Sequence, residues 1–147
     1  MKGMNEIILK TKHTELVKLE LIDGGQKGIL QIAEAEKNIP FPIRRVFMMS
    51  GVTKGESRGA HGHKKFDQII VPVQGSFVLG LDDGETKQEI LLDDPGIGIR
   101  LKPKLWHTMH SFSSDAVNVV FCDQYYDEED YLRDYDEFLA YIKANPD

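Results

Sequence analysis

Short runs of apolar residues, separated by Gly, Pro and Asp, fill the chain from residue 16 to residue 122. Runs of this length, spaced about 8–12 residues apart, are typical of β-strands in an all-β sandwich or barrel. Asp83-Gly84 is a two-residue hairpin signal, and residues 93–96 indicate a second turn. Strands are expected at Leu16–Leu21, Ile29–Ala33, Arg44–Met49, Phe66–Val73, Ser76–Leu81, Glu85–Leu91, Ile97–Leu101, His107–Phe112 and Val117–Cys122.

The last part of the chain follows a helical period instead. Between Asp127 and Ala144, apolar residues recur at positions 131, 132, 135, 138, 139 and 142. Asp127 suits an N-cap, and the acidic residues 128–130 suit the positive end of a helix dipole. We therefore expect a helix over residues 127–144 that covers one face of the barrel, within a single domain of residues 1–147. Residues 1–14 are expected either to fray or to form an edge strand.

Composition narrows the class of protein. Of the 147 residues, 41% are hydrophobic and 29% charged, an ordinary balance for a globular protein. The net charge of −6 and the lack of a dense basic cluster argue against a nucleic-acid partner. No apolar stretch is long enough for a membrane helix or a signal peptide, so we expect a cytoplasmic protein. The single cysteine, Cys122, excludes an internal disulfide.

Four of the five histidines lie between His61 and His110. His61 and His63 are two positions apart in a segment expected to be extended, so their side chains should point to the same side. The spacing Gly-x5-His61-x-His63-x4-Gln68-x6-Gly resembles the first motif of the cupins, and Gly98-x4-Pro103-x3-His107 resembles the second. The resemblance implies a cupin jelly-roll barrel.

These histidines have three interpretations: a metal site, surface residues of a hairpin, or acid–base catalysts. His61, His63, Gln68 and His107 could bind a transition metal, but Gln is a weak neutral ligand and stands where metal-binding cupins usually carry Glu. The histidines could also be plain surface residues of a hairpin. The third interpretation is acid–base catalysis without a metal, since an imidazole exchanges protons near neutral pH. We favour this third interpretation and expect no metal and no cofactor.

Basic residues near the histidines suggest an anionic substrate. Arg58, three positions before His61, is the strongest candidate. The basic residues that could hold an anionic substrate are Arg45, Arg58, Lys64, Lys65, Arg100 and Lys102.

Two strings make a more specific resemblance. Arg58-Gly-Ala-His61-Gly-His63-Lys-Lys and Tyr125-Tyr-Asp-Glu-Glu-Asp-Tyr131 are similar to those of the dTDP-sugar 3,4-ketoisomerases, and the resemblance runs from about residue 30 to residue 141. The family is metal-independent and moves the carbonyl of dTDP-4-keto-6-deoxy-glucose from C4 to C3.

The resemblance also implies roles for individual residues. His61 would be the base that transfers the proton, His63 would assist it, and Arg58 and Gln68 would line the ligand site. Phe47 stands where relatives typically carry Tyr, and it has no hydroxyl to offer. Trp106 and Phe47 are the candidates for an apolar slot that would hold the thymine base of the family's substrate. Lys27 and His107 would influence the configuration at C4 of the product, and they favour galacto. Substrate contacts are further expected from Arg45, Lys65, Arg100, Trp106, Lys27 and His107.

Other functions stay open from the sequence alone. They are a metal-dependent cupin dioxygenase or isomerase, a dTDP-sugar 3,5-epimerase-like cupin, and a non-catalytic sugar-binding cupin. The resemblance further implies a homodimer paired through sheet edges, and a place in the synthesis of 3-amino sugars for O-antigen, lipopolysaccharide, S-layer or other surface glycans.

Overall fold

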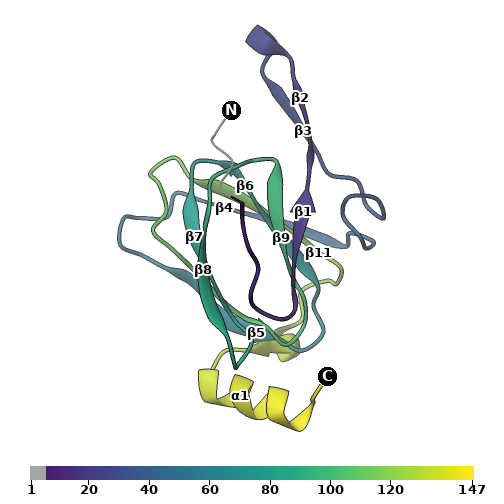
Figure 1. Cartoon of the computed structure of the whole chain (residues 1–147), viewed down its shortest axis with the longest axis vertical. Helices are drawn as coiled ribbons and strands as arrows, with labels where there is room; N and C mark the ends of the chain where they lie inside the picture. Colours follow the sequence, from purple (N-terminus) through teal and green to yellow (C-terminus); the bar gives the residue numbers. More distant parts are fainter. Residues whose placement is uncertain (1–5) are drawn as a thin grey trace.

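Two antiparallel sheets of five strands build the barrel in the computed structural model, which describes residues 6–147 (Figure 1). The first sheet has the strand order β1 (Thr14–Lys18), β9 (Ile97–Leu101), β6 (Gln68–Gln74), β11 (Val117–Cys122) and β4 (Arg45–Ser50). The second has the order β12 (Tyr131–Leu132), β5 (Arg58–His63), β10 (Trp106–His110), β7 (Phe77–Asp82) and β8 (Lys87–Leu92).

The main core lies between the sheets. Inward-facing residues of β7 and β8, such as Leu79 and Leu92, pack with residues of β6 and β9, such as Ile70 and Ile99, and all four are at most 1% exposed. Burying a Leu or Ile side chain contributes roughly 1.5–3 kcal/mol, so this alternation of inward apolar residues stabilises the barrel. The all-β barrel predicted from the strand pattern is confirmed.

A two-stranded arm leaves the barrel directly after β1, the first strand of the chain. β2 (Glu20–Asp23) and β3 (Ile29–Ile32) form this hairpin, and the 3₁₀ turn η1 (Gly25–Lys27) closes it. The single strand predicted over Leu16–Leu21 is therefore wrong. Its residues divide at Leu19, whose side chain is buried and whose backbone N–H donates to the carbonyl of Gly96. The arm projects away from the barrel (Figure 1).

The predicted C-terminal helix starts later than expected. Asp127 caps only the 3₁₀ turn η2 (Glu128–Asp130), by accepting from the N–H of Glu129. The chain then pairs with β5 as strand β12, and α1 (Tyr135–Ala144) begins after the N-cap Asp134. The helical period from residue 131 was misleading because residues 131 and 132 form a strand, in which Tyr131 is half-buried and Leu132 is buried.

Other boundaries moved by a few residues. The predicted strand His107–Phe112 ends at His110 because Ser111 has a left-handed backbone, with a φ of 55°. At the N-terminus, residues 6–13 form neither helix nor strand, while the expectation for residues 1–5 lies outside the described residues. Within residues 6–147, no helix is long and apolar enough to cross a membrane.

Candidate active site

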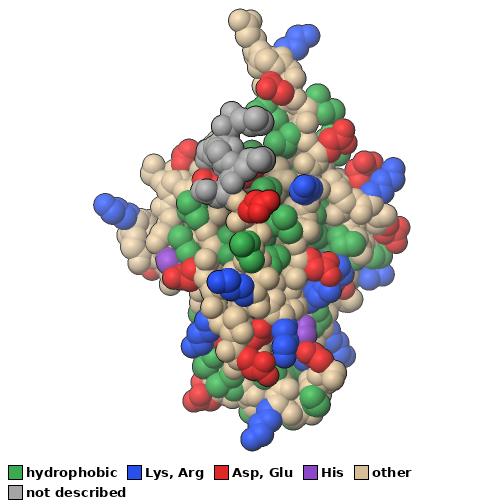
Figure 2. Space-filling view, in the orientation of Figure 1, with side chains coloured by type: hydrophobic (Ala, Val, Ile, Leu, Met, Phe, Trp, Pro, Cys, Tyr) green, Lys and Arg blue, Asp and Glu red, His purple; other side chains and the backbone are tan. Residues whose placement is uncertain are grey.

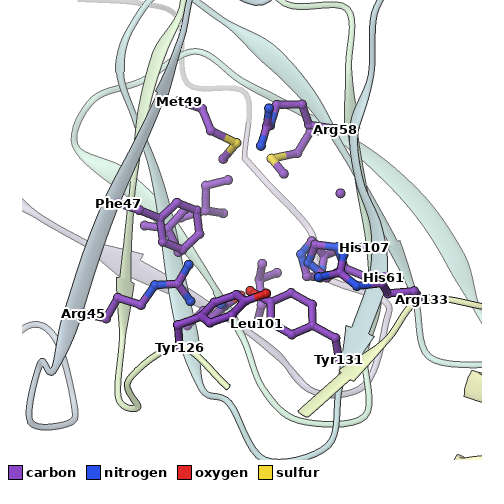
Figure 3. A pocket seen from close by; sticks show the side chains of 15 residues that line it. Arg45, Phe47, Met49, Arg58, His61, Leu101, His107, Tyr126, Tyr131 and Arg133 are labelled. Atoms are coloured by element: carbon purple, nitrogen blue, oxygen red, sulfur yellow. The ribbon is translucent and has the colours of Figure 1, made fainter. Parts of the chain in front are cut away.

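A cavity of about 290 Å³ lies between the two sheets, and Tyr126, Tyr131 and Arg133 of the segment after β11 also line it (Figure 3). Strands β4, β5, β6, β9, β10 and β11 supply its walls. Its lining residues are Arg45, Phe47, Met49, Arg58, Gly59, His61, Gln68, Ile70, Leu101, His107, Met109, Val120, Tyr126, Tyr131 and Arg133.

Three histidines cluster at one wall of this cavity. His61 of β5 pairs with His107 of the neighbouring strand β10, and their ring centroids are 4.7 Å apart. The rings of His61 and His63 are 5.0 Å apart, which confirms that they share one side of β5. His61 and His107 line the cavity, whereas His63 is 3% exposed and lies behind the lining.

An irregularity in β5 accompanies this arrangement. The register against β10 shifts between His107 and Thr108, so that Ala60 has no partner between Gly59 and His61. Gly59 and Ala60 both have positive φ, 83° and 60°. A β-bulge of this kind re-aims the next side chain and increases the local twist. The bulge thus immediately precedes the histidine that lines the cavity.

Burial keeps the two lining histidines neutral. Burial is the largest of the effects that lower the pKa of His61 from 6.5 to about 4, and the neighbouring His63 and Arg133 act in the same direction. Complete burial likewise holds the pKa of His107 well below 6.5. Both imidazoles are therefore uncharged at pH 7, and each has a nitrogen lone pair that can accept a proton.

A buried carboxylate holds His63. Asp130 is 5% exposed, and its Oδ2 lies 3.1 Å from Nδ1 of His63. Burial alone would raise the pKa of Asp130. Hydrogen bonds from His63 and from the backbone N–H groups of Lys65 and Phe66 outweigh that effect and leave the pKa below its usual value. Asp130 is therefore ionised at pH 7.

The histidine cluster also fits a metal ion. One ring nitrogen from each of His61, His63 and His107 lies within 4.8 Å of the others, and neutral imidazoles suit Zn, Fe, Ni or Cu. These residues would hold the ion, and it would polarise a substrate carbonyl as a Lewis acid. Gln68 lines the cavity from β6 of the other sheet; it is buried, and its amide nitrogen lies 3.4 Å from the sulfur of Cys122.

Arg45 lies across the cavity from His61 and His107, whereas Arg133 lies beside them (Figure 3). The guanidinium of Arg45 lies over the rings of Phe47 and Tyr126, 4.6 and 5.1 Å from their centroids. Its Nη1 is buried and has no hydrogen-bond partner among residues 6–147. Arg133 differs because it is paired with Glu128 at 2.8 Å. A buried donor without a partner indicates an anionic or carbonyl group of a ligand.

Four residues predicted to bind substrate lie outside this cavity. Lys27 is exposed at the tip of the β2–β3 arm, and Lys65 is exposed after β5. Arg100 is bound to Asp67 and Glu15, on the opposite face of its strand from the cavity residue Leu101. The ring of Trp106 packs against α1 through Tyr135 and Phe138, and it borders a separate surface depression.

Sequence reasoning missed the contribution of the segment after β11. Tyr126 and Tyr131 line the cavity, and the ring of Tyr131 lies 5.0 Å from that of His61. Asp130 belongs to a run of four acidic residues, and no pattern in the sequence separates the buried member from its exposed neighbours. The sequence pattern placed residues 127–130 at the start of a helix, and the resemblance included this string without giving its residues a role in the site.

Comparisons with known proteins agree with this geometry. Residues 12–143 match the FdtA family, described as WxcM-like, C-terminal. The TDP-4-oxo-6-deoxy-α-D-glucose-3,4-oxoisomerase of Aneurinibacillus thermoaerophilus is 48% identical over 123 residues, which is 84% of this chain and 87% of that protein.

Solved structures give the same result for the fold. QdtA, a sugar 3,4-ketoisomerase from Thermoanaerobacterium thermosaccharolyticum solved with TDP, superimposes with a TM-score of 0.88 at 33% identity, over 92% of this chain and 98% of QdtA. A variant of QdtA has been solved with TDP-4-keto-6-deoxyglucose. WlaRB, a TDP-quinovose 3,4-ketoisomerase from Campylobacter jejuni, has a TM-score of 0.83 at 34% identity, over 88% and 99% of the two chains. With its cupin-like barrel and this degree of identity, the chain belongs to the FdtA family of sugar-nucleotide 3,4-ketoisomerases.

Proposed function

We propose that this protein is an isomerase that moves the carbonyl of TDP-4-keto-6-deoxyglucose from C4 to C3. The observation that carries the proposal is the cavity itself. It holds the neutral imidazoles of His61 and His107 and, within the same lining, the guanidinium of Arg45, whose buried Nη1 has no hydrogen-bond partner among residues 6–147. A base for a carbon-bound proton and a cation for a diphosphate are what this reaction requires. The 48% identical relative bears the name of this activity.

Two proton transfers are needed, one from C3 to C4 and one from O3 to O4. His61 takes the proton from C3, which is acidified by the neighbouring ketone, and an enediolate forms. His61 then returns the proton to C4 while the hydroxyl proton of O3 passes to O4, so that the substrate and the product have the same atoms. His107 hydrogen-bonds to the substrate oxygens. His63 assists His61 by hydrogen bonding, in keeping with its place behind the cavity wall.

Phe47 takes a different part from the tyrosine expected at its position. It lines the cavity, and its ring supports the guanidinium of Arg45 at 4.6 Å. A cation held over an aromatic ring gains about 0.5–2 kcal/mol, which orders a long side chain before the ligand arrives. In this proposal Phe47 positions Arg45 and carries no proton.

Arg58 should bind the diphosphate at the open end of the cavity. Replacing Arg58 with Ala should weaken the binding of TDP by about 1.5–3 kcal/mol, because a charge-assisted hydrogen bond is lost. Isothermal titration calorimetry measures the change. Arg44→Ala is the matched control, because Arg44 is exposed, donates to the backbone carbonyl of Asp123 and does not line the cavity. An unchanged affinity for Arg58→Ala would remove this residue from the site.

A metal-dependent cupin is the second candidate, favoured by the spacing of the three ring nitrogens. The proposal predicts that treatment with a chelator leaves turnover unchanged, since His61 needs only its own lone pair. The check is activity before and after chelation, together with elemental analysis of the purified protein. A loss of turnover that added metal restores would support the metal-dependent reaction instead.

The β2–β3 arm supports the homodimer expected from the sequence. Ile22, Ile29 and Leu30 on this arm are 46%, 60% and 63% exposed, and Figure 2 shows apolar side chains on its surface. Met48 on the outermost strand β4 is 69% exposed as well. A second copy would cover these side chains. Light scattering at micromolar concentration should give twice the mass of the 16.7 kDa chain, and a monomer mass would contradict the dimer.

The function is tested by turnover in deuterated water with NMR identification of the product. The expected product is a 3-keto sugar whose C4 carries the hydrogen returned by His61, as deuterium to the extent that protonated His61 exchanges with the solvent, and whose C5 carries no deuterium. Label at C5 would indicate an epimerase, and an unchanged substrate would indicate a binding protein. The NMR spectrum of the product also gives the configuration at C4, for which galacto is predicted. The cytoplasmic location and the role in surface glycans stay predictions.

A further inference from the structure

The buried carboxylate of Asp130 has three hydrogen-bond partners, and one of them is His63. Oδ1 accepts from the backbone N–H of Lys65 at 2.7 Å. Oδ2 accepts from the backbone N–H of Phe66 at 3.2 Å and faces Nδ1 of His63 at 3.1 Å. The backbone carbonyl of Asp130 also accepts from the N–H of Lys64. These hydrogen bonds hold the turn η2 against residues 64–66, which follow β5.

This geometry fixes the tautomer of His63. An ionised carboxylate can only accept hydrogen bonds, so Nδ1 of His63 must carry a proton. In the neutral ring, Nε2 then has the lone pair. Nε2 is buried and has no hydrogen-bond partner among residues 6–147. Since Nδ1 is occupied by Asp130, Nε2 is the nitrogen left to face His61 and His107.

We propose that Asp130 is a positioning residue that keeps the proton of His63 on Nδ1 and so presents the Nε2 lone pair to the histidine cluster. Its consequence for catalysis rests on the proposed function. When His61 takes the proton from C3, it becomes a buried cation. A lone pair backed by a carboxylate stabilises that cation, whereas an N–H pointing toward it would oppose the transfer.

The change Asp130→Asn tests the proposal because the amide has only one acceptor oxygen. If this oxygen keeps the shorter bond to Lys65, the NH₂ group takes the place of Oδ2. It then donates to Nδ1 of His63 and loses the weaker bond from Phe66. Nδ1 can accept only if the proton has moved to Nε2. The same change in a catalytic triad leaves the geometry intact and traps the wrong tautomer.

The experiment combines NMR with kinetics. Long-range ¹H–¹⁵N spectra of the ligand-free wild type should show His63 as the Nδ1–H tautomer, and Asp130→Asn should show Nε2–H. With TDP-4-keto-6-deoxyglucose, kcat of the variant should fall by about 10²-fold at a nearly unchanged KM, because Asp130 does not line the cavity. Asp83→Asn is the matched control. Asp83 is 7% exposed and accepts from the backbone N–H groups of Lys12, Glu85 and Thr86, none of which lines the cavity. Its kcat should not change.

The outcomes are separable. An Nε2–H tautomer of His63 in the wild type overturns the proposal even if Asp130→Asn does not fold. An equal loss of kcat in Asp130→Asn and Asp83→Asn reduces Asp130 to a structural residue and overturns it too. If the wild type shows the Nδ1–H tautomer but turns over no substrate, the proposed function fails while the assignment of the tautomer stands.

Discussion

Replacing His61 with Asn should reduce kcat by about 10²–10⁴-fold, since the general base is lost. Asn keeps much of the volume and some hydrogen bonding, so the barrel and the affinity for TDP should persist. The direct readout is exchange of the C3 proton with deuterated water, followed by NMR. His61 is the candidate because it lines the cavity and because burial lowers its pKa to about 4, which leaves it neutral at pH 7.

Two further variants sharpen this prediction. His63→Asn should cost less than His61→Asn, because His63 lies behind the cavity wall and only assists. His110→Asn should have no effect on exchange, since His110 pairs with Glu89 outside the cavity. If His61→Asn still exchanged the C3 proton at nearly the wild-type rate, the base would have to be His63 or His107.

Phe138→Ala should lower the free energy of unfolding by about 3–5 kcal/mol, the usual cost of truncating a buried Phe. Phe138 is 0% exposed and anchors α1 to the barrel. Its contact there is Gly62, the residue between the two histidines of β5. A Cβ added to Gly62 would lie 2.9 Å from Cδ1 of Phe138. The helix therefore packs directly on the backbone that carries His61 and His63.

Urea unfolding followed by circular dichroism measures this change. Lys143→Ala, at an exposed position in the last turn of α1, is the control and should change stability by less than about 0.5 kcal/mol. A loss below about 1 kcal/mol for Phe138→Ala would mean that α1 does not hold the barrel through this side chain.

Local patterns were enough to predict much of the fold. Asp83-Gly84 was expected to turn between two strands, and Gly84 indeed has a φ of 93° where β7 returns as β8. The strand over Val117–Cys122 matches β11 at both ends. The two-residue period also brought His61 and His63 to one side, because alternation is a property of the extended chain itself.

The remaining features depend on contacts between distant segments. His107 meets His61 only because β10 pairs with β5 across a shifted register. Asp130 becomes buried only because β12 joins the edge of β5, and the same pairing breaks the helix expected from residue 127. Arg100 looked like a substrate ligand, but its partners Asp67 and Glu15 are 33 and 85 residues away.

The central claim is that the carbonyl moves from C4 to C3 of the sugar. The most direct test supplies TDP-4-keto-6-deoxyglucose with carbon-13 at C4 and follows that carbon by NMR as the protein is added. The account predicts that the labelled ketone signal is replaced by that of an alcohol-bearing carbon, and that His61→Asn abolishes most of the rate. A label that stays a ketone in the presence of the wild-type protein would contradict it.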